Sequence, residues 1–586
     1  MKYVFVTGGV ISGVGKGIIA SSTGLLLKAL GYRVTMIKID PYINVDAGTM
    51  APTEHGEVFV LADGGEVDLD LGNYERYLNI TLSRDHSITT GKMYQHIIER
   101  ERAGDFLGQT VQVIPHLTDA IEQWIERVAK IPVDDSREVP QICVIELGGT
   151  LGDIENAPFA EALKQLRVSA GPGNVVHTHV SYIPVVVGGE QKTKPTQQTI
   201  RIVRGAGLYP DLVACRCQHK LQEDTTKKIA GHCQLNRDQV LAVHDVSSTY
   251  LVPALLESQG LSRSLTRLLN LGADIDHLSR EKGALMWKAW KEATSVRDET
   301  CQSADLPTVS IALVGKYTSF IDSYMSLVRS LEHAAMACRR KLQLVLVDAS
   351  KLEPATLATD SAEYEKTWQS VREASGILVP GGFDTRGTEG MVAAIRWARE
   401  SGTPFLGICL GMQLAVVEFA RNVCGFSDAT SAEFSADGVA KNEGEPQGGK
   451  DVIIYMPELD RSRLGGTMRL GLRPTHYRPG TERSKIWRLY NAKKLLIVHE
   501  RHRHRYEVDP AYVQTLESNG LHLVGRDETG IRTEVVEIRD HTWFVGVQFH
   551  PEYTSKVLGP NRCILGFFAA CAGCLADLKA ARDDLP

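Results

Sequence analysis

Short apolar runs rich in β-branched residues alternate with helix-like segments over the first 272 residues of the chain. Runs that are apolar on both faces are typical of parallel strands in a sheet that helices cover on both sides. We therefore predict an α/β domain over residues 1–272. Its predicted helices include 17–30 and 196–204, and its predicted strands are 2–7, 32–39, 142–147, 183–187, 211–215 and 240–245.

A second series of the same kind follows a break in this pattern. Residues 273–307 lose strand character and gain charge, which predicts a helix-containing interdomain linker that ends at Pro307. A second α/β domain is predicted over 308–586, with a mobile surface loop at 435–465, where Gly, Glu and Asp are frequent. Its predicted strands are 309–315, 342–348, 376–380, 404–409 and 543–549.

Length, charge and cysteine usage restrict the class of protein. A chain of 586 residues is too long for one hydrophobic core. Its formal net charge of −6 argues against nucleic acid as a partner. No apolar run approaches the roughly 20 residues that cross a bilayer, so we predict no membrane partner. The 11 cysteines are irregularly spaced without a secretory signal or a second pair at zinc-ligand spacing, which predicts reduced thiols and a cytoplasmic location.

The strongest catalytic signal is a cysteine between a predicted strand and a predicted helix. Gly407-Ile408-Cys409-Leu410-Gly411 has the layout of a nucleophile elbow with Cys in place of Ser, and its small residues relieve crowding at the turn. The N-terminus of the following helix favours the thiolate, and the Leu410 amide can face an oxyanion. Taken alone, the segment could equally be a sharp turn with an inert buried cysteine.

Two further strand ends complete this candidate site. His550 ends a strand and Glu552 follows it, so a base and its orienting carboxylate are two residues apart. Gly381 and Gly382 follow another strand and let a main-chain N–H approach a tetrahedral intermediate. Together these segments resemble the class I glutamine amidotransferase domain over 308 to about 575. The resemblance implies Cys409, His550 and Glu552 as the catalytic triad, with glutamine held by Gly382, Leu410, Gly411, Met412, Gln413, Glu433 and Arg503.

A glycine-rich turn, GGVISGVGKG (8–17), follows the first predicted strand and offers backbone amides and Lys16 to a phosphate. The match to a Walker loop is imperfect. Gly17 replaces the Ser or Thr whose hydroxyl reaches Mg²⁺, and the spacing of the glycines is one residue longer. Metal ligands are then expected among carboxylates, with Asp70 and Glu146 as candidates. It is as plausible from sequence that Asp70 caps a turn and Glu146 pairs with a lysine.

Several segments in the first 272 residues resemble the synthetase domain of the CTP synthase family: VTGGVISGVGKG, KIDPYINVDAGTM, HGEVFV, DLDLGNYER, GDIE and KTKPTQ. That domain is a dethiobiotin-synthetase-like P-loop fold, so the resemblance implies two doubly wound α/β domains. It implies Mg²⁺ on Asp70 and Glu146, and ATP contacts at Gly13, Val14, Gly15, Lys16, Gly17, Ile18, Lys38, Asp70, His244, Asp245 and Val246. It implies UTP or CTP contacts at Ser12, Asp153, Ile154, Glu155, Lys192, Thr193, Lys194, Pro195, Thr196, Gln197 and Lys228.

Two basic segments can be interpreted either as functional sites or as ordinary turns at the surface. Lys192 to Gln197 place two lysines where Pro195 opens a helix, which suits a second triphosphate or an ordinary surface turn. Arg503 lies within the run 501–505, and we predict that the other members of this run form a solvated basic turn.

The reaction implied by the resemblance is ATP-dependent amination of UTP at C4, with ammonia from glutamine. The resemblance also implies GTP as allosteric activator, CTP as feedback inhibitor, His55 and Val58 near a path for ammonia, and a homotetramer able to form filaments. It does not place the GTP site, and segments 437–465 and 473–495 are longer than the family pattern. The alternatives are a cobyrinic-acid-type amidase, which amidates carboxylates, and a non-catalytic filament or scaffold protein.

Overall fold

The computed structural model describes residues 1–272, 275–298, 306–434, 450–457, 468–478, 480–491 and 497–579. The chain divides into two compact units, of which unit 1 consists of residues 1–47 and 67–304. Unit 2 consists of residues 48–66 and 305–586. Residues 48–66, which we call the strap, are thus part of unit 2 although the first half of the sequence contains them.

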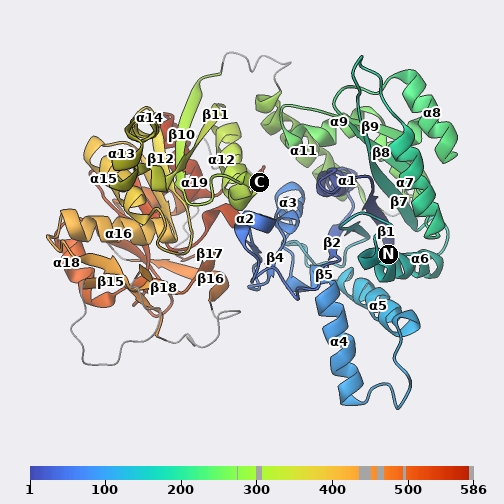
Figure 1. Cartoon of the computed structure of the whole chain (residues 1–586), viewed down its shortest axis with the longest axis horizontal. Helices are drawn as coiled ribbons and strands as arrows, with labels where there is room; N and C mark the ends of the chain where they lie inside the picture. Colours follow the sequence, from blue (N-terminus) through green and yellow to red (C-terminus); the bar gives the residue numbers. More distant parts are fainter. Residues whose placement is uncertain are drawn as a thin grey trace. The chain divides into compact units, whose positions relative to one another are not determined.

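Unit 1 is built on a seven-stranded parallel sheet with the order β5-β2-β6-β1-β7-β8-β9. Its strands are β1 (Lys2–Gly8), β2 (Val34–Asp40), β5 (Ser87–Thr89), β6 (Ile142–Leu147), β7 (Val175–Ile183), β8 (Leu212–Cys217) and β9 (Val240–His244). Tyr3 and Phe5 pack into a core with side chains of α4, α5 and α6. Helix α1 contacts β1, β2 and β6 and packs against α3 and α9–α11. Figure 1 shows helices lying along the strands of this unit. The helices are α1 (Lys16–Ala29), α3 (Leu69–Leu78), α4 (Thr90–Ala103), α5 (Thr118–Val128), α6 (Ala157–Ala170), α7 (Lys194–Gly205), α8 (Glu223–Cys233), α9 (Val252–Ser258), α10 (Leu261–Leu268) and α11 (His277–Thr294).

Unit 2 is built on a nine-stranded mixed sheet with the order β11-β10-β12-β13-β21-β20-β19-β16-β17. Its strands are β10 (Thr308–Gly315), β11 (Lys341–Asp348), β12 (Gly376–Val379), β13 (Phe405–Ile408), β16 (Arg469–Tyr477), β17 (Ile497–His504), β19 (His522–Arg526), β20 (Thr533–Glu537) and β21 (Phe544–Val547). Buried side chains of α12, α17 and α19 form one core against this sheet, and those of α14, α15 and α16 form another. Both predicted α/β folds are therefore confirmed, with helices on both faces of each sheet.

The remaining elements of unit 2 are short. A small sheet contains β14 (Ala429–Ser431), β15 (Lys450–Tyr455) and β18 (Tyr506–Val508). The strap contains α2 (Pro52–His55) and β3 (Phe59–Val60), and β3 pairs with β4 (Glu66–Val67). The helices are α12 (Met325–Cys338), α13 (Pro354–Thr359), α14 (Ser361–Arg372), α15 (Thr388–Ser401), α16 (Leu410–Asn422), α17 (Lys485–Asn491), α18 (Val513–Ser518) and α19 (Arg562–Cys571).

Two local predictions are wrong. Residues 184–187 do not continue a strand, because β7 ends at Ile183. The predicted loop at 435–465 contains the strand β15, in which Val452 and Ile453 are fully buried. The other residues of that loop are mostly outside the described ranges, as are 479 and 492–496 of segment 473–495. None of the helices in the described ranges combines the length and apolarity needed to cross a bilayer.

Candidate active site

Three neighbouring parallel strands of unit 2 bring the predicted triad and its glycine turn together. β13 lies between β12 and β21, so the residues that follow these strands meet at one edge of the sheet. Cys409 follows β13 with φ 52° and ψ −105°, a strained conformation for a non-glycine residue at a strand-to-helix turn. A Cβ added to Gly411 would lie 2.1 Å from the Val379 carbonyl oxygen, so this elbow requires glycine there.

His550 and Glu552 form a base with its orienting carboxylate. His550 Nδ1 lies 2.7 Å from Glu552 Oε1. Burial lowers the pKa of His550, but the Glu552 carboxylate and Cys409 outweigh this effect and raise the pKa to about 10. Cys409 lines the same cavity as His550, and an imidazolium there is the kind of group that supports a nucleophilic thiol. Gln548 Nε2 lies 3.7 Å from Cys409 Sγ, a contact that sequence reasoning did not anticipate.

One cavity joins the predicted triad with Gly382 and Arg503. Its lining includes Pro52, Val58, Gly381, Gly382, Phe383, Cys409, Arg503, His550, Glu552 and Tyr553. Leu410 to Gln413 form the first turn of α16, where Gln413 Nε2 donates to the Tyr506 carbonyl at 2.9 Å. Glu433 is not part of this lining, and its carboxylate accepts the Asp384 N–H at 3.1 Å.

Sequence reasoning also missed Lys316, which follows β10. Lys316 Nζ donates to the Phe383 carbonyl at 3.0 Å and so supports the turn beside Gly382. Burial lowers the pKa of Lys316 to about 8. Its position directly after an apolar strand is the signal that could have identified it.

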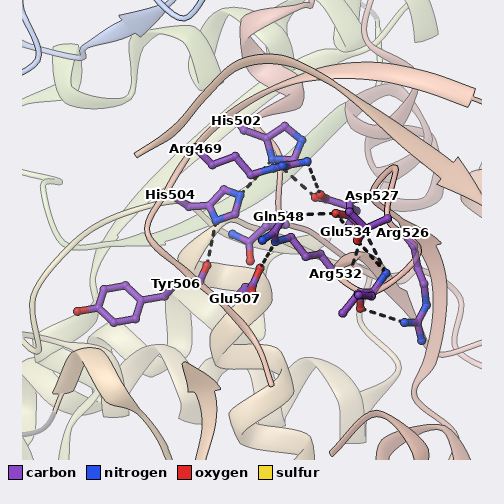
Figure 2. A network of polar contacts seen from close by, with 12 residues as sticks. Arg469, His502, His504, Tyr506, Glu507, Arg526, Asp527, Arg532, Glu534 and Gln548 are labelled. Atoms are coloured by element: carbon purple, nitrogen blue, oxygen red, sulfur yellow. Dashed lines mark hydrogen bonds and ion pairs between the residues drawn. The ribbon is translucent and has the colours of Figure 1, made fainter. Parts of the chain in front are cut away.

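The prediction of a solvated basic turn at 501–505 is wrong. Most of this run belongs to β17, and Arg501, His502 and His504 are 4%, 0% and 3% exposed. Figure 2 shows the reason: Glu534 lies beside Arg469 and His502, so the polar side chains at this place have polar partners inside the unit. His502 Nδ1 lies 3.2 Å from His504 Nε2, and burial lowers the pKa of both histidines.

In unit 1 the P-loop shares a cavity with a cluster of carboxylates, of which Asp40 and Glu146 are buried and Asp70 is half-buried. Lys38 Nζ lies 3.2 Å from Asp40, 3.7 Å from Glu146 and 3.9 Å from Asp68, and it also binds Asp70. Burial lowers the pKa of Lys38, but these carboxylates outweigh the effect and raise it well above its usual value. Burial raises the pKa of Asp40 and of Glu146 to about 7.

The substitution of glycine for Ser or Thr after Lys16 has a structural reason. A Cβ added to Gly17 would lie 2.5 Å from Asp70 Oδ1 and 3.5 Å from Glu146 Oε2. The bare glycine therefore lets two carboxylates occupy the place next to the phosphate loop where a Walker hydroxyl would be. Within the described ranges no group of three or more His, Cys, Asp or Glu side chains is arranged to hold a metal. Two carboxylates that share Mg²⁺ with phosphate oxygens and water fit its usual coordination.

Several of the other predicted ATP contacts line one cavity. A cavity lined by Val14, Gly15 and Ile18 also contains His244 to Val246, so the loop and the predicted adenine segment come together. Arg216 was missed; it lines the same cavity and binds Asp245.

Two of the predicted pyrimidine residues line different cavities. Asp153 lines one on α6 and α7, whereas Ser12 lines the P-loop cavity. Pro195 lies in the first turn of α7, as predicted, and Lys192 binds Glu190 at 2.6 Å. Neither of these two cavities includes Lys192, Lys194 or Lys228.

The fold and the two sites define a class of protein, a glutamine amidotransferase joined to a P-loop nucleotide-dependent synthetase. Residues 2–271 match the family described as CTP synthase N-terminus, and residues 319–570 match glutamine amidotransferase class-I. The chain belongs to the CTP synthase family, whose members are glutamine-hydrolysing ligases.

The relatives match over nearly their whole length. CTP synthase of Eremothecium gossypii is 55% identical over 99% of this chain and 98% of its own. CTP synthase of Schizosaccharomyces pombe is 56% identical over 100% of this chain and 94% of its own. A solved structure of the Trypanosoma brucei CTPS glutaminase domain with bound acivicin is 36% identical, covers 45% of this chain and 94% of that chain, and has a TM-score of 0.40.

Proposed function

We propose that this chain aminates UTP at C4 to give CTP, using ATP and ammonia released from glutamine at Cys409. The single observation that supports it best is the cavity in which Cys409, His550, Glu552 and the turn at Gly381 meet, in a chain that also has a P-loop. The assignment of roles to individual residues is part of this proposal.

In the glutaminase step the Cys409 thiolate attacks the amide carbon of glutamine. The resulting oxyanion faces the N–H groups of Leu410 and the glycine turn after β12. His550 protonates the departing ammonia and then takes a proton from the water that hydrolyses the thioester. Glu552, bonded to the other ring nitrogen, keeps the imidazole aimed and stabilises its charged form.

In the synthetase step ATP transfers its γ-phosphoryl group to O4 of UTP, ammonia adds at C4, and phosphate leaves. Phosphorylation is needed because hydroxide is a poor leaving group. P-loop amides and Lys16 hold phosphate oxygens, and Lys38 offsets the developing charge. Asp70 and Glu146 would hold Mg²⁺, which neutralises phosphate charge when bound.

Further properties of the enzyme rest on family resemblance alone. They are activation by GTP, inhibition by CTP, a homotetramer able to form filaments, a cytoplasmic location, and transfer of ammonia near His55 and Val58. We propose them with the main activity. Val58 does line the cavity that contains Cys409, whereas His55 is exposed.

The test is CTP formation, followed by the absorbance change from uracil to cytosine, with glutamine or ammonia as nitrogen source. We expect C409A to lose synthesis with glutamine and keep synthesis with ammonia, because separate sites carry the two reactions. K16A should lose both syntheses and keep basal release of glutamate. C424A, which changes a half-buried cysteine outside the cavity, is the control and should resemble the wild type.

Each alternative gives a different outcome. Loss of CTP formation from both glutamine and ammonia in a folded C409A enzyme would contradict the assignment of the two reactions to separate sites. Absence of CTP together with amidation of a carboxylate would favour the cobyrinic-acid-type amidase. A scaffold protein would release no glutamate, and C409A would then change nothing.

A further inference from the structure

Several backbone carbonyls of the strap accept hydrogen bonds from the rest of unit 2. The carbonyl oxygen of Pro52 accepts the Ser323 hydroxyl at 2.8 Å, and that of Val60 accepts Arg501 Nη1 at 3.0 Å. The carbonyl oxygen of Ala62 accepts the Leu472 N–H at 2.9 Å. Bonds at three places along the strap hold it in a defined position beside the glutaminase cavity.

Tyr553 lies between the strap and the catalytic base. Its ring stacks on the His550 imidazole with centroids 5.0 Å apart and an interplanar angle of 17°. Its hydroxyl donates to the Val58 carbonyl at 3.1 Å, and the Phe59 ring meets it edge-on at 5.2 Å. Tyr553 is 7% exposed and Phe59 is fully buried, so solvent does not loosen these contacts.

Two separate constraints act on the His550 ring. The bond from Nδ1 to Glu552 holds one atom but leaves the ring free to tilt about that bond. A stacked aromatic ring opposes tilting, because tilting breaks the contact between the two faces. The stack in turn depends on where Tyr553 is, and its hydroxyl is anchored to Val58.

We propose that Tyr553 is a positioning residue for His550, and that the strap sets the plane of the catalytic imidazole through it. The proposal rests on the proposed glutaminase activity. The plane of the ring decides whether Nε2 faces Cys409, so it governs formation of the thiolate and proton transfer to ammonia. Glutamine binding does not depend on it.

Two variants separate the ring from the hydroxyl. Y553F keeps the stack and loses the bond to Val58, whereas Y553L loses both. We expect kcat for glutamine hydrolysis to fall by about 3- to 10-fold in Y553F, which is the range for one hydrogen bond, and further in Y553L, with KM for glutamine unchanged in both. Y477F removes a buried tyrosine hydroxyl outside the cavity of the same unit and should behave as the wild type.

A second readout reports the thiolate directly. The rate at which iodoacetamide alkylates Cys409 at pH 7, measured by mass spectrometry of its peptide, should fall by about threefold or more in Y553L, because a tilted imidazolium no longer stabilises the thiolate. CTP formation from ammonia should stay within twofold of the wild type in every variant. If Y553L loses CTP formation from ammonia, it is misfolded, and the proposal is then judged on Y553F alone.

Two results would overturn the proposal. One is a kcat and an alkylation rate within twofold of the wild type in the variants; the other is an equal loss with ammonia and with glutamine, which indicates a general structural role. Failure here is distinguishable from failure of the proposed function. If the wild type releases glutamate and C409A does not, the glutaminase assignment stands whatever the Tyr553 variants do.

Discussion

The substitution G17A tests whether Asp70 acts beside the phosphate loop. An added Cβ would lie 2.5 Å from Asp70 Oδ1, whereas ordinary contacts begin at 3.4 Å, so the carboxylate must retreat by about 0.9 Å. The same carboxylate binds Lys38, so the retreat also loosens that ion pair. The backbone of the loop is unchanged by a single methyl group, which makes the perturbation local to the carboxylate.

The expected loss of activity follows from the free-energy cost of adding a methyl group to a packed site. Overpacking by one methyl group costs about 1–3 kcal/mol. If this cost falls on the ATP-bound transition state, kcat/KM for ATP decreases by about 5- to 150-fold. CTP formation from ammonia and from glutamine should decrease alike, while glutamine hydrolysis without ATP stays at the wild-type rate.

The assay is the absorbance change of UTP to CTP with ammonia, at varied ATP. The matched control is G231A in α8, where no atom lies within 4 Å of an added Cβ, and it should keep full activity with equal or slightly higher stability. A G17A enzyme that forms CTP from ammonia within twofold of the wild type would refute the reasoning, because Asp70 would then not be needed at this position.

Two further predictions concern unit 2. In G381A the added Cβ would lie 2.9 Å from His550 Cε1, so glutamine hydrolysis should fall by about tenfold while CTP formation from ammonia persists; an unchanged rate of glutamate release would show that the turn yields instead. Burial raises the pKa of Glu534 to about 8 despite Arg469. The folded state therefore holds this proton more tightly than the unfolded chain, and wild-type stability falls between about pH 4.5 and 8. E534Q has no such proton, so its Tm should rise relative to the wild type across this window; a constant Tm difference contradicts this assignment.

The sequence predicted strands in which apolar residues dominate a short run, because a strand covered on both faces has few polar positions to interrupt the pattern. It did not predict β7, which carries His177 and His179 in the middle of the sheet. Both histidines are buried and bonded to the Thr7 hydroxyl, at 2.7 and 2.8 Å. A polar residue whose partner is on another strand looks like a surface residue until the pairing of strands is known.

The candidate glutaminase site could likewise be predicted only in part. Cys409 and His550 could be proposed from sequence because each lies at the end of an apolar run, where side chains of α/β proteins reach their ligands. In the structure Cys409 directly follows β13, and His550 lies three residues after the end of β21. The pairing of β13 with β21 could not be predicted from sequence, since more than a hundred residues separate the two strands. The buried run at β17 was misjudged because charge alone does not reveal that Glu534 is within reach.

The resemblance placed His55 and Val58 near a path for ammonia, but the pattern of residues did not predict that the strap packs with the second half of the chain. Backbone carbonyls accept several of the strap's bonds, alongside the Glu57 and Glu66 carboxylates, and a backbone acceptor leaves no trace in the type of residue. Its short apolar run, with Val58 and Phe59, reads as an ordinary strand of the first half of the chain. Yet Pro52 and Val58 line the cavity that contains Cys409, and the Val58 carbonyl holds the hydroxyl of the ring stacked on His550. Residues 308–586 alone therefore do not complete the glutaminase cavity. The orientation of the His550 ring depends also on the strap, which lies near the start of the sequence.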